Sequence, residues 1–220
     1  MSEHSASSAS QYVCGCNEVH TRKRIVLTGG PGAGKTAVLE LCRQYFCRHV
    51  AILPEAASLL FDGGFPRRGR SEERAATQRA IYYVQRELEC IADAQDNEAI
   101  VLCDRGTIDG AAYWPGPASL FDQVGTTHAA ELARYSAVLH LRTPEPQDYN
   151  HDNPARIESA REAAVIDEAI ARAWREHPRC FVVASAPSFL DKARAALAIL
   201  RAELPGCCAE RLPPFLARSA

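Results

Sequence analysis

The chain has 220 residues, a hydrophobic fraction of 47% and a formal net charge of −2 at pH 7. This length suits one layered α/β core with tails, and the small net charge argues against broad attraction to nucleic acid or to an anionic membrane. No apolar run approaches the roughly 20 residues needed to span a bilayer, and the Ser/Ala-rich N-terminus lacks the apolar core of a signal peptide. We therefore expect a cytoplasmic protein that neither binds nucleic acid nor spans a membrane.

The N-terminal part of the chain leads from a polar tail into a strand and a glycine-rich loop. Residues 1–21 are mostly small and polar, so they cannot bury enough surface to offset their ordering entropy, and we expect a flexible tail. The apolar residues 25–28 predict the first strand. The residues that follow fit the pattern G-x-x-x-x-G-K-[ST] of a phosphate-binding loop: Gly29, Gly30, Pro31, Gly32, Ala33, Gly34, Lys35 and Thr36.

This loop predicts a site for a nucleotide and its Mg²⁺. Glycines let consecutive backbone N–H groups turn towards phosphate oxygens, and the positive end of the following helix, expected over 35–46, adds to the attraction. In this pattern Lys35 reaches the β- and γ-phosphates, and the hydroxyl of Thr36 binds Mg²⁺. A glycine-rich turn without a ligand has no use for a lysine and a threonine at the helix start, so we predict a nucleotide site.

An acidic candidate follows the next apolar run. Residues 49–53 predict a strand that ends at Pro54, and Glu55 comes directly after it. Ligands of open parallel sheets bind at the carboxyl ends of the strands, so Glu55 is well placed for chemistry. Its alternative role is that of a first-turn acid that stabilises a helix expected over 56–61. The sequence leaves both roles open.

A basic loop and a long helix come next. Residues 62–70 are rich in Gly, Pro and Arg and predict a loop, whose arginines either meet a phosphate of the acceptor or remain solvated. Residues 71–95 predict a helix that can flank a substrate pocket. The spacing of its apolar residues predicts one buried face, formed by Ile81, Val84, Leu88 and Ile91.

The strongest signal after the glycine-rich loop is the run 99–103 with the Asp104-Arg105 pair behind it. A continuously apolar run is typical of a central parallel strand, and an acid directly after it matches the Walker B arrangement that holds Mg²⁺ directly or through water. Arg105 is then placed to meet phosphate oxygens, whereas the alternative role of Asp104 is to cap the next helix. Asp109 is a further acid of the same crevice, and the aromatic loop 113–117 is expected to wall the acceptor site.

The C-terminal half predicts a lid. A helix over 127–133 and a strand over 137–141 precede a polar segment that is too long for a tight turn, and we expect a lid over about 143–161. Arg156 and Arg161 lie near its mobile end. They either stabilise the transferring phosphoryl group or pair with neighbouring glutamates.

The nine cysteines cannot all pair with one another. Those in apolar runs are expected to behave as small buried hydrophobes in a reducing cytosol: Cys42, Cys47, Cys90, Cys103 and Cys180. Four others are candidates for a metal site with His4 or His20, although their spacing matches no recognised zinc pattern: Cys14, Cys16, Cys207 and Cys208. Thiols without a metal are therefore the expectation.

Strands that alternate with helices, completed by a strand over 180–184 and a helix over 188–203, predict an α/β fold. The expected architecture is a three-layer P-loop domain with a five-stranded parallel sheet, helices on both faces and a kinase-like lid. The chain resembles the P-loop kinases, and in particular the ATPases known as AAA domain proteins that are similar to nicotinamide-riboside kinases. The resemblance covers about Arg24 to Pro205. It rests on four segments: 29–36, 53–57, 103–110 and 149–154.

Composition and the helix stop expected at Pro205 and Gly206 divide the chain into a flexible tail over 1–21, a kinase-like domain over 22–205 and a C-terminal tail over 206–220. A looser resemblance to deoxynucleoside kinases concerns an acid after the second strand and an acid–arginine pair after the third. It implies that Glu55 is the base for the acceptor hydroxyl or a water-mediated partner of Mg²⁺.

Together these signals predict phosphoryl transfer from Mg·ATP to a hydroxyl of a nucleoside- or riboside-like acceptor. ATP is preferred because no N/T-K-x-D guanine-reading motif is present. The alternative is a nucleotide-dependent regulatory NTPase with a protein or lipid partner, because eukaryotic members of the same family look like such regulators. The sequence leaves the acceptor and the oligomeric state open. The expected catalytic residues are Lys35, Glu55, Asp104, Arg105, Arg156 and Arg161, with Thr36 and Asp104 on the metal.

Overall fold

The computed structural model of the chain describes residues 15–67, 69–95, 98–145, 158–186 and 188–209. Its strands are β1 (Lys23–Thr28), β2 (Val50–Leu53), β3 (Ile100–Asp104), β4 (Ala137–Leu141) and β5 (Cys180–Val183). The longer helices are α1 (Lys35–Tyr45), α2 (Ala56–Asp62), α3 (Ser71–Asp93), α7 (Ala160–Trp174) and α8 (Phe189–Glu203). The short ones are a 3-10 turn, η1 (Thr107–Asp109), and α4 (Gly110–Tyr113), α5 (Leu120–Gln123), α6 (His128–Leu132) and α9 (Gly206–Ala209).

The strands form one parallel sheet in the order β2-β3-β1-β4-β5. The central strand β1 pairs with β3, with Leu27 opposite Asp104, and with β4, with Thr28 opposite His140. The predicted five-stranded parallel sheet is thereby confirmed. Its central strands are apolar almost throughout because helices cover both of their faces.

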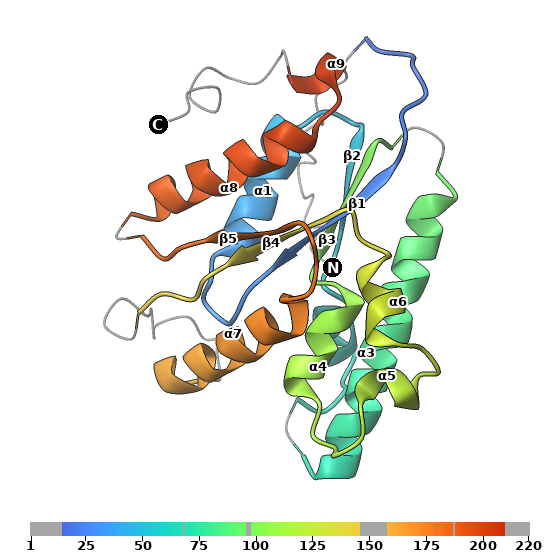
Figure 1. The fold of residues 1–220 in the computed structure, drawn as a ribbon, viewed down its shortest axis with the longest axis vertical. Coiled ribbons are helices and arrows are strands. Elements are labelled where there is room, and N and C mark those ends of the chain that lie inside the picture. Colours follow the sequence, from blue (N-terminus) through green and yellow to red (C-terminus); the bar gives the residue numbers. More distant parts are fainter. Residues whose placement is uncertain (1–14, 68, 96–97, 146–157, 187, 210–220) are drawn as a thin grey trace, which may run out of the picture.

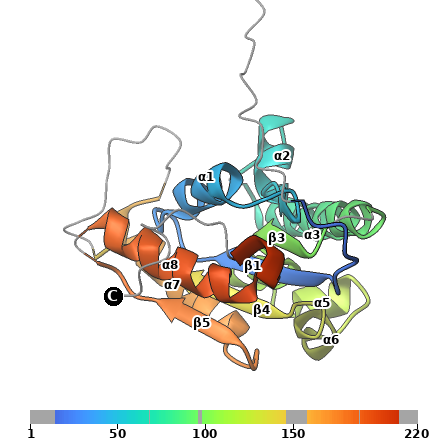
Figure 2. The ribbon, with the colours of Figure 1, turned by 90° about the horizontal axis from the view of Figure 1, so that it is seen from above.

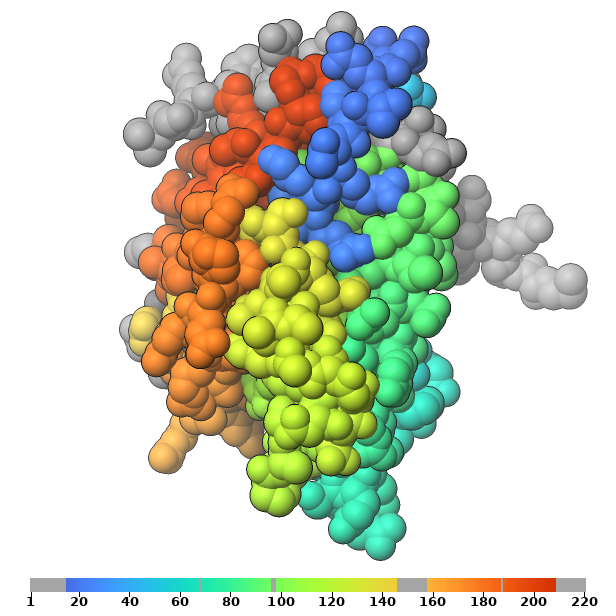
Figure 3. Space-filling view, turned by 45° about the vertical axis from the view of Figure 1, so that its right-hand side comes forward, coloured from blue at the N-terminus to red at the C-terminus, as the bar shows by residue number. Residues whose placement is uncertain are grey.

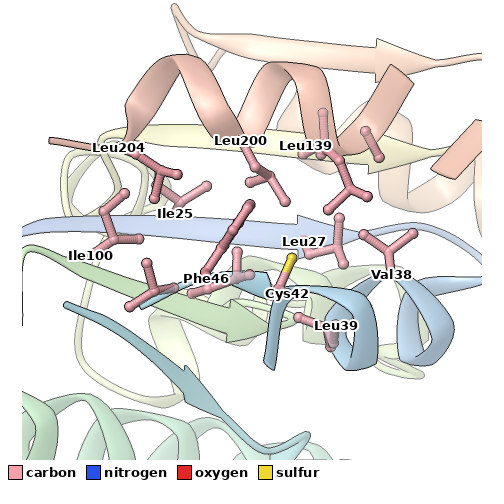
Figure 4. Close-up of a cluster of buried hydrophobic side chains, with 14 of the residues drawn as sticks. Ile25, Leu27, Val38, Leu39, Cys42, Phe46, Ile100, Leu139, Leu200 and Leu204 are labelled. Carbon is pink, nitrogen blue, oxygen red and sulfur yellow. The ribbon is translucent and has the colours of Figure 1, made fainter. Parts of the chain in front are cut away.

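Successive residues of β1 belong to different cores, as the alternation of side chains along a strand requires. Ile25 and Leu27 belong to the core under α1 and α8, which Figure 4 shows in close-up. Val26 belongs to the core on the other face, together with Ile170 and Trp174 of α7. Figure 1 shows α1 and α8 on one side of the sheet and α3, α4 and α7 on the other, and Figure 2 shows the strands between α1 and the pair α5 and α6. The predicted three layers are therefore present.

The carboxyl ends of β1, β2 and β3 meet at one edge of the sheet. The glycine-rich loop follows β1, and Asp104 is the last residue of β3. Glu55 is the second residue after β2, with Pro54 between them. The strand β1 lies between β3 and β4. After β1 the chain continues on the β3 side of the sheet, to β2, whereas after β3 it crosses to the opposite side of β1, to β4. Such a reversal of strand order creates the crevice in which open α/β sheets bind ligands.

The prediction for the buried face of α3 is wrong in part. Ile91 is 59% exposed, and Cys90, which was expected in the core, is exposed as well. The buried positions of the helix include the polar side chains of Gln85 and Glu89, because each finds a partner inside the protein. The Gln85 Nε2 donates a hydrogen bond to Glu89 at 2.9 Å, and the hydroxyl of Tyr135 donates another at 2.8 Å. The spacing of apolar residues predicted the buried face of α3 incorrectly, because it assumes that polar side chains face water. Gln85 and Glu89 are buried because their polar groups are hydrogen-bonded inside the protein.

Several predictions concern segments outside the described residues. They include residues 146–157 of the expected lid with the 149–154 motif and Arg156, as well as residues 1–14 and 210–220 of the expected tails. The described end of the lid segment leads into α7, which begins at Ala160. Ser159 caps this helix, since its hydroxyl accepts the N–H of Glu162 at 3.2 Å while the Glu162 carboxylate accepts the N–H of Ser159 at 2.8 Å. Within the ranges that the structure describes, no helix is both long and apolar enough to cross a bilayer.

Candidate active site

The glycine-rich loop connects β1 to α1, and its shape depends on its glycines. Gly29 has a φ of 139°, and Gly34, the residue before α1, has a φ of 91°, a backbone region that side chains with a Cβ rarely adopt. At Gly29 a Cβ would also lie 2.1 Å from the carbonyl oxygen of Leu141 on β4. The loop backbone therefore lies directly against the carboxyl end of the sheet.

Lys35 points back into the loop. Its Nζ donates hydrogen bonds to the carbonyl oxygens of Gly29 at 3.0 Å and Gly30 at 3.3 Å, and the residue is 9% exposed. Burial, and then the positive charge of Arg105, lower the pKa of Lys35 to about 8. A phosphate in the loop would supply the negative charge that this ammonium needs in its buried position.

The loop is also tied to α7, through Asp167. One carboxylate oxygen of Asp167 accepts the N–H of Gly30 and the Nε2–H of His140 on β4, both at 2.8 Å. Although burial favours the neutral acid, the hydrogen bonds from His140 and Gly30 lower the pKa of Asp167. The buried carboxylate therefore links the phosphate-binding loop, the sheet and the helix that follows the expected lid.

Glu55 is held by Arg105 across the crevice. The Nε of Arg105 donates to one oxygen of Glu55 at 2.5 Å, and the hydroxyl of Ser58 donates to the other at 2.6 Å. Burial opposes ionisation, but the charges of Arg105 and Lys35 together with these hydrogen bonds lower the pKa of Glu55 to about 2. Glu55 is therefore ionised at any ordinary pH. It stands directly before α2, but its side chain makes no capping hydrogen bond to this helix and lines the cavity instead.

Arg105 has an unusual backbone. Its φ of 71° makes it the one non-glycine residue with a left-handed backbone among those described. Its guanidinium also contacts Asp109 at 3.1 Å and lies over the ring of Tyr113, 5.7 Å from the ring centre. Residues held in this backbone region cost free energy and are concentrated at functional sites, so the conformation marks Arg105 as a positioned residue.

Asp104 differs from Glu55 in having an unsatisfied oxygen. Its Oδ1 is buried and has no hydrogen-bond partner among the described residues. Burial, and then the negative charge of Glu55, raise the pKa of Asp104 to about 6. Together with the hydroxyl of Thr36, which lines the same cavity, this oxygen forms the kind of hard donor set that Mg²⁺ prefers. The residues present therefore fit the metal ion that the loop motif implies.

Asp109 lines the same cavity, as predicted, but its carboxylate is engaged in a network of buried hydrogen bonds. It accepts hydrogen bonds from Trp174 Nε1 at 3.0 Å and the N–H of Gly106 at 3.1 Å, and also from the hydroxyl of Thr28 and from Arg105. The residue is 3% exposed. Its carboxylate therefore ties β1, α7 and the turn after β3 together beneath the crevice.

These side chains border a cavity of about 850 Å³ that extends from the phosphate-binding loop between α2, α3 and α7. Tyr113 lines it, whereas Trp114 is not among the described lining residues and donates its indole N–H to the carbonyl of Ala118 at 2.6 Å. The expected aromatic wall thus consists of Tyr113. Eight of the predicted site residues are on the cavity: Pro31, Gly32, Lys35, Thr36, Glu55, Asp104, Arg105 and Arg161.

The family model known as "AAA domain" matches residues 24–192, which is well over half of the chain. The chain belongs to this AAA domain family. No curated protein matches it. The family match spans the loop, both acids and α7, so all the residues that line the cavity lie within the matched part of the chain.

Three solved structures, two of them thymidylate kinases, share the fold of this chain. A thymidylate kinase from Candida albicans is 12% identical, with a TM-score of 0.57 over 83% of this chain and 92% of that one. A thymidylate kinase from Ehrlichia chaffeensis is 16% identical, with a TM-score of 0.50 over 84% of this chain and 100% of that one. The NadR protein in complex with NR is 16% identical, with a TM-score of 0.60, and the match covers 80% of this chain but 52% of NadR. These likenesses establish a P-loop kinase-like fold.

Sequence reasoning gave no site role to several residues that lie at or beside this cavity. Gln78 and Gln85 of α3 line the cavity seven positions apart, two helical turns along one face. The spacing of these amides was visible in the sequence, but it was obscured by the apolar residues between them. Asp167 offered another signal, since it interrupts the otherwise apolar buried stripe of α7 that Ala163, Ile170 and Trp174 form.

Replacing Asp104 with asparagine is expected to raise the melting temperature at pH 7.5. The pKa of Asp104 is about 6 in the folded protein against an ordinary value of 3.8, so ionisation disfavours the folded state by about 3 kcal/mol, which corresponds to roughly 10 °C. This penalty is present above pH 6 and disappears as the pH falls through the folded pKa towards 4. Melting curves of both proteins without added Mg²⁺ test the expectation.

The exposed Asp122 on α5 supplies the matched control, because Asp122→Asn is expected to change the melting temperature little at either pH. An Asp104→Asn protein that melts below the wild type at pH 7.5, or a gain that persists unchanged at pH 4, would contradict the account given for Asp104.

Proposed function

We propose that the protein transfers a phosphoryl group from Mg·ATP to a hydroxyl of a small nucleoside- or riboside-like acceptor. The observation that carries this proposal is the cavity that continues from the phosphate-binding loop, with Glu55 and Asp104 in different electrostatic environments among the carboxylates that border it. A protein that only binds a nucleotide needs the loop, whereas a kinase also needs an enclosed space for the acceptor beside it.

The nucleotide end of the site has the parts that phosphoryl transfer requires. The loop amides and Lys35 would bind the β- and γ-phosphates, and Thr36 and Asp104 would hold Mg²⁺, which neutralises charge on the phosphates when it is bound. The unpaired Oδ1 of Asp104 supports this assignment, because a buried carboxylate oxygen without a partner is costly unless a ligand satisfies it.

Glu55 is the group best suited to receive the acceptor hydroxyl. With a pKa of about 2 it stays ionised, and Arg105 and Ser58 fix its orientation at the edge of the cavity. A hydroxyl that donates a hydrogen bond to Glu55 would be aligned towards the loop. Because phosphoryl transfer depends mainly on positioning and on charge stabilisation, a weakly basic but well-oriented carboxylate is sufficient.

The lining of the cavity supports an acceptor with a polar ring. Gln78 and Gln85 offer amide donors and acceptors from α3, and Tyr113 offers an aromatic ring beneath Arg105. The volume of about 850 Å³ suits a small molecule rather than a macromolecule. Thymidylate kinases and NadR in complex with NR share this fold, which supports the same class of acceptor.

Arginines at the end of the lid segment would complete the charge stabilisation. Arg161, on the first turn of α7, lines the cavity and is exposed. Arginine distributes its charge over several phosphate oxygens, so Arg161 is suited to the transferring group. Arg156 lies outside the described residues and keeps this role as part of the proposal.

One contact favours a second function, a nucleotide-dependent regulatory NTPase with a protein or lipid partner. The hydrogen bond from the N–H of Gly30 to Asp167 connects the loop directly to α7, so a nucleotide that reorients the loop would also act on this helix. In this alternative the movement of α7, rather than transfer to an acceptor, would be the output.

ADP release from Mg·ATP, measured with and without nucleosides, nicotinamide riboside and small alcohols, tests the proposal. We expect one class of acceptor to raise turnover by at least about 10²-fold and to become phosphorylated, and we expect Glu55→Gln to lower this stimulated turnover by about 10²–10⁴-fold. Slow ADP release that no acceptor changes would overturn the kinase proposal and favour the regulatory function.

A further inference from the structure

A cluster of cysteines and histidines lies at the end of the sheet opposite to the nucleotide site. His20 precedes β1 and His49 precedes β2, so both mark the amino ends of parallel strands whose carboxyl ends carry the loop and Glu55. The length of β1 separates the two sites by roughly 20 Å. We name the group the cysteine–histidine cluster; it consists of Cys16, His20, Cys47, His49, Cys207 and Cys208.

Three distant segments of the chain supply the cluster. Cys16 and His20 come from the residues before β1, Cys47 and His49 from the turn between α1 and β2, and Cys207 and Cys208 from α9. Figures 1 and 3 both show α9 and the segment leading into β1 at the same end of the molecule. The cluster therefore joins the two ends of the described chain to the core.

The ligand atoms form two groups of three, each within 4.8 Å of one another. The group of Cys47, His49 and Cys208 is buried, whereas Cys16, His20 and Cys207 are half-buried. Cys207 adjoins both, since its Sγ lies 3.7 Å from the Sγ of Cys208 and 3.9 Å from the Nδ1 of His49. Cys207 can therefore complete the buried group to four ligands.

Two of the separations among these atoms are close to those of a tetrahedral zinc site. Zinc bonds of about 2.3 Å to sulfur and about 2.0–2.1 Å to nitrogen place two sulfurs about 3.8 Å apart and a sulfur and a nitrogen about 3.6 Å apart. The Cys208 Sγ lies 3.3 Å from the His49 Nδ1 and 3.7 Å from the Cys207 Sγ, close to those separations. The shorter distance of 2.7 Å between the sulfurs of Cys47 and Cys208 is the one that must widen.

We propose that Cys47, His49, Cys207 and Cys208 bind one structural zinc ion. Three thiolates and an imidazole form a closed ligand set that zinc fills without an open position, so the ion would stabilise the fold and would take no part in the reaction. Burial excludes water from the Cys47, His49 and Cys208 side of the site.

His20 has a supporting place beside the proposed ion. Its Nε2 lies 3.4 Å from the Sγ of Cys207 and 3.5 Å from that of Cys16, and its ring packs edge-on against His49 with centres 4.9 Å apart. A hydrogen bond from His20 would orient the Cys207 sulfur, as outer contacts commonly do for metal ligands. The sequence concealed this site because its ligand pairs are 47/49 and 207/208, and neither is a zinc pattern alone.

Metal analysis of the full chain tests the proposal. The chain is purified under reducing conditions without a chelator from zinc-supplemented cultures, and zinc is measured per polypeptide. We expect about one zinc in the wild type, less than about a fifth of that in Cys208→Ser, and an unchanged content in two matched variants, Cys16→Ser and the exposed Cys90→Ser. Zinc that is lost with Cys16→Ser but kept in Cys208→Ser would overturn the ligand assignment, as would two zinc ions per chain.

A second measurement covers the case in which Cys208→Ser does not fold. Extraction of zinc from the wild type with a chelator is expected to lower the melting temperature by roughly 10 °C, and added zinc should restore it. Cobalt added to the extracted protein should give the thiolate charge-transfer and d–d absorption of a tetrahedral site. The proposal would be overturned if zinc-free wild-type protein showed no cobalt absorption and no rise in melting temperature with zinc. A disulfide between Cys47 and Cys208 in the reduced preparation would also overturn it.

Discussion

Replacing Lys35 with alanine is expected to lower kcat/KM for Mg·ATP by roughly 10²–10³-fold. The ammonium lies inside the phosphate-binding loop, where it would stabilise charge that develops on the phosphates in the transition state. Stability should behave differently. The folded pKa of about 8 lies below the ordinary value of 10.5, so below pH 8 the buried charge of Lys35 disfavours the folded state. The variant should therefore melt at or above the wild-type temperature at pH 7.

Arg43 on the same helix provides the control. Its side chain is 43% exposed and pairs with Glu40 at 3.3 Å on the surface of α1, so Arg43→Ala should leave turnover and melting temperature nearly unchanged. Steady-state kinetics and thermal melts of the three proteins measure both parts of the expectation. If Lys35→Ala turned over as fast as the wild type, the phosphate-binding loop would not be the site of the reaction. If the variant melted well below the wild type, the buried charge of Lys35 would not be destabilising.

Replacing Asp109 with alanine is expected to cost about 3–5 kcal/mol of unfolding free energy. The buried carboxylate accepts hydrogen bonds from Thr28, Gly106 and Trp174 and pairs with Arg105. Its removal leaves a guanidinium and several buried donors without their acceptor, which is the costly way to break such a network. Urea unfolding monitored by circular dichroism and by tryptophan fluorescence measures the change.

The comparison with Asp122→Ala separates this role from a general effect of removing an acid. Asp122 is exposed on α5, and its replacement should change stability by less than about 0.5 kcal/mol. If Asp109→Ala unfolds at the wild-type urea concentration but loses activity, Asp109 acts in the chemistry and the structural role described above is wrong.

The elements of the fold were accessible to sequence reasoning where the signal was local. Apolar runs identified all five strands, and the residues 29–36 identified the loop, because phosphate binding needs that set of residue types at that spacing. Reasoning failed on α3, where Ile91 is exposed and Gln85 is buried. Apolar periodicity assumes that polar side chains face water, and it cannot recognise a polar group whose partner, such as Glu89 or Tyr135, lies inside the protein.

The candidate site divides in the same way. Lys35 follows from the loop motif, and Glu55, Asp104 and Arg105 follow from position, since each stands at or just beyond the carboxyl end of a predicted strand. The different pKa values of Glu55 and Asp104 could not be predicted from the sequence. They arise because Arg105 pairs with Glu55, whereas one oxygen of Asp104 has no hydrogen-bond partner among the described residues.

By itself the sequence determined the α/β architecture, the phosphate-binding loop and the acids that accompany it, because these features depend on backbone preferences and on residue types close together in the chain. Only the tertiary structure decided that Asp167 binds the N–H of Gly30 across 137 positions, and that the cysteines and histidines of three segments meet at the far end of the sheet. The physical reason is that strand order and helix packing bring such residues together, and neither is encoded in local spacing.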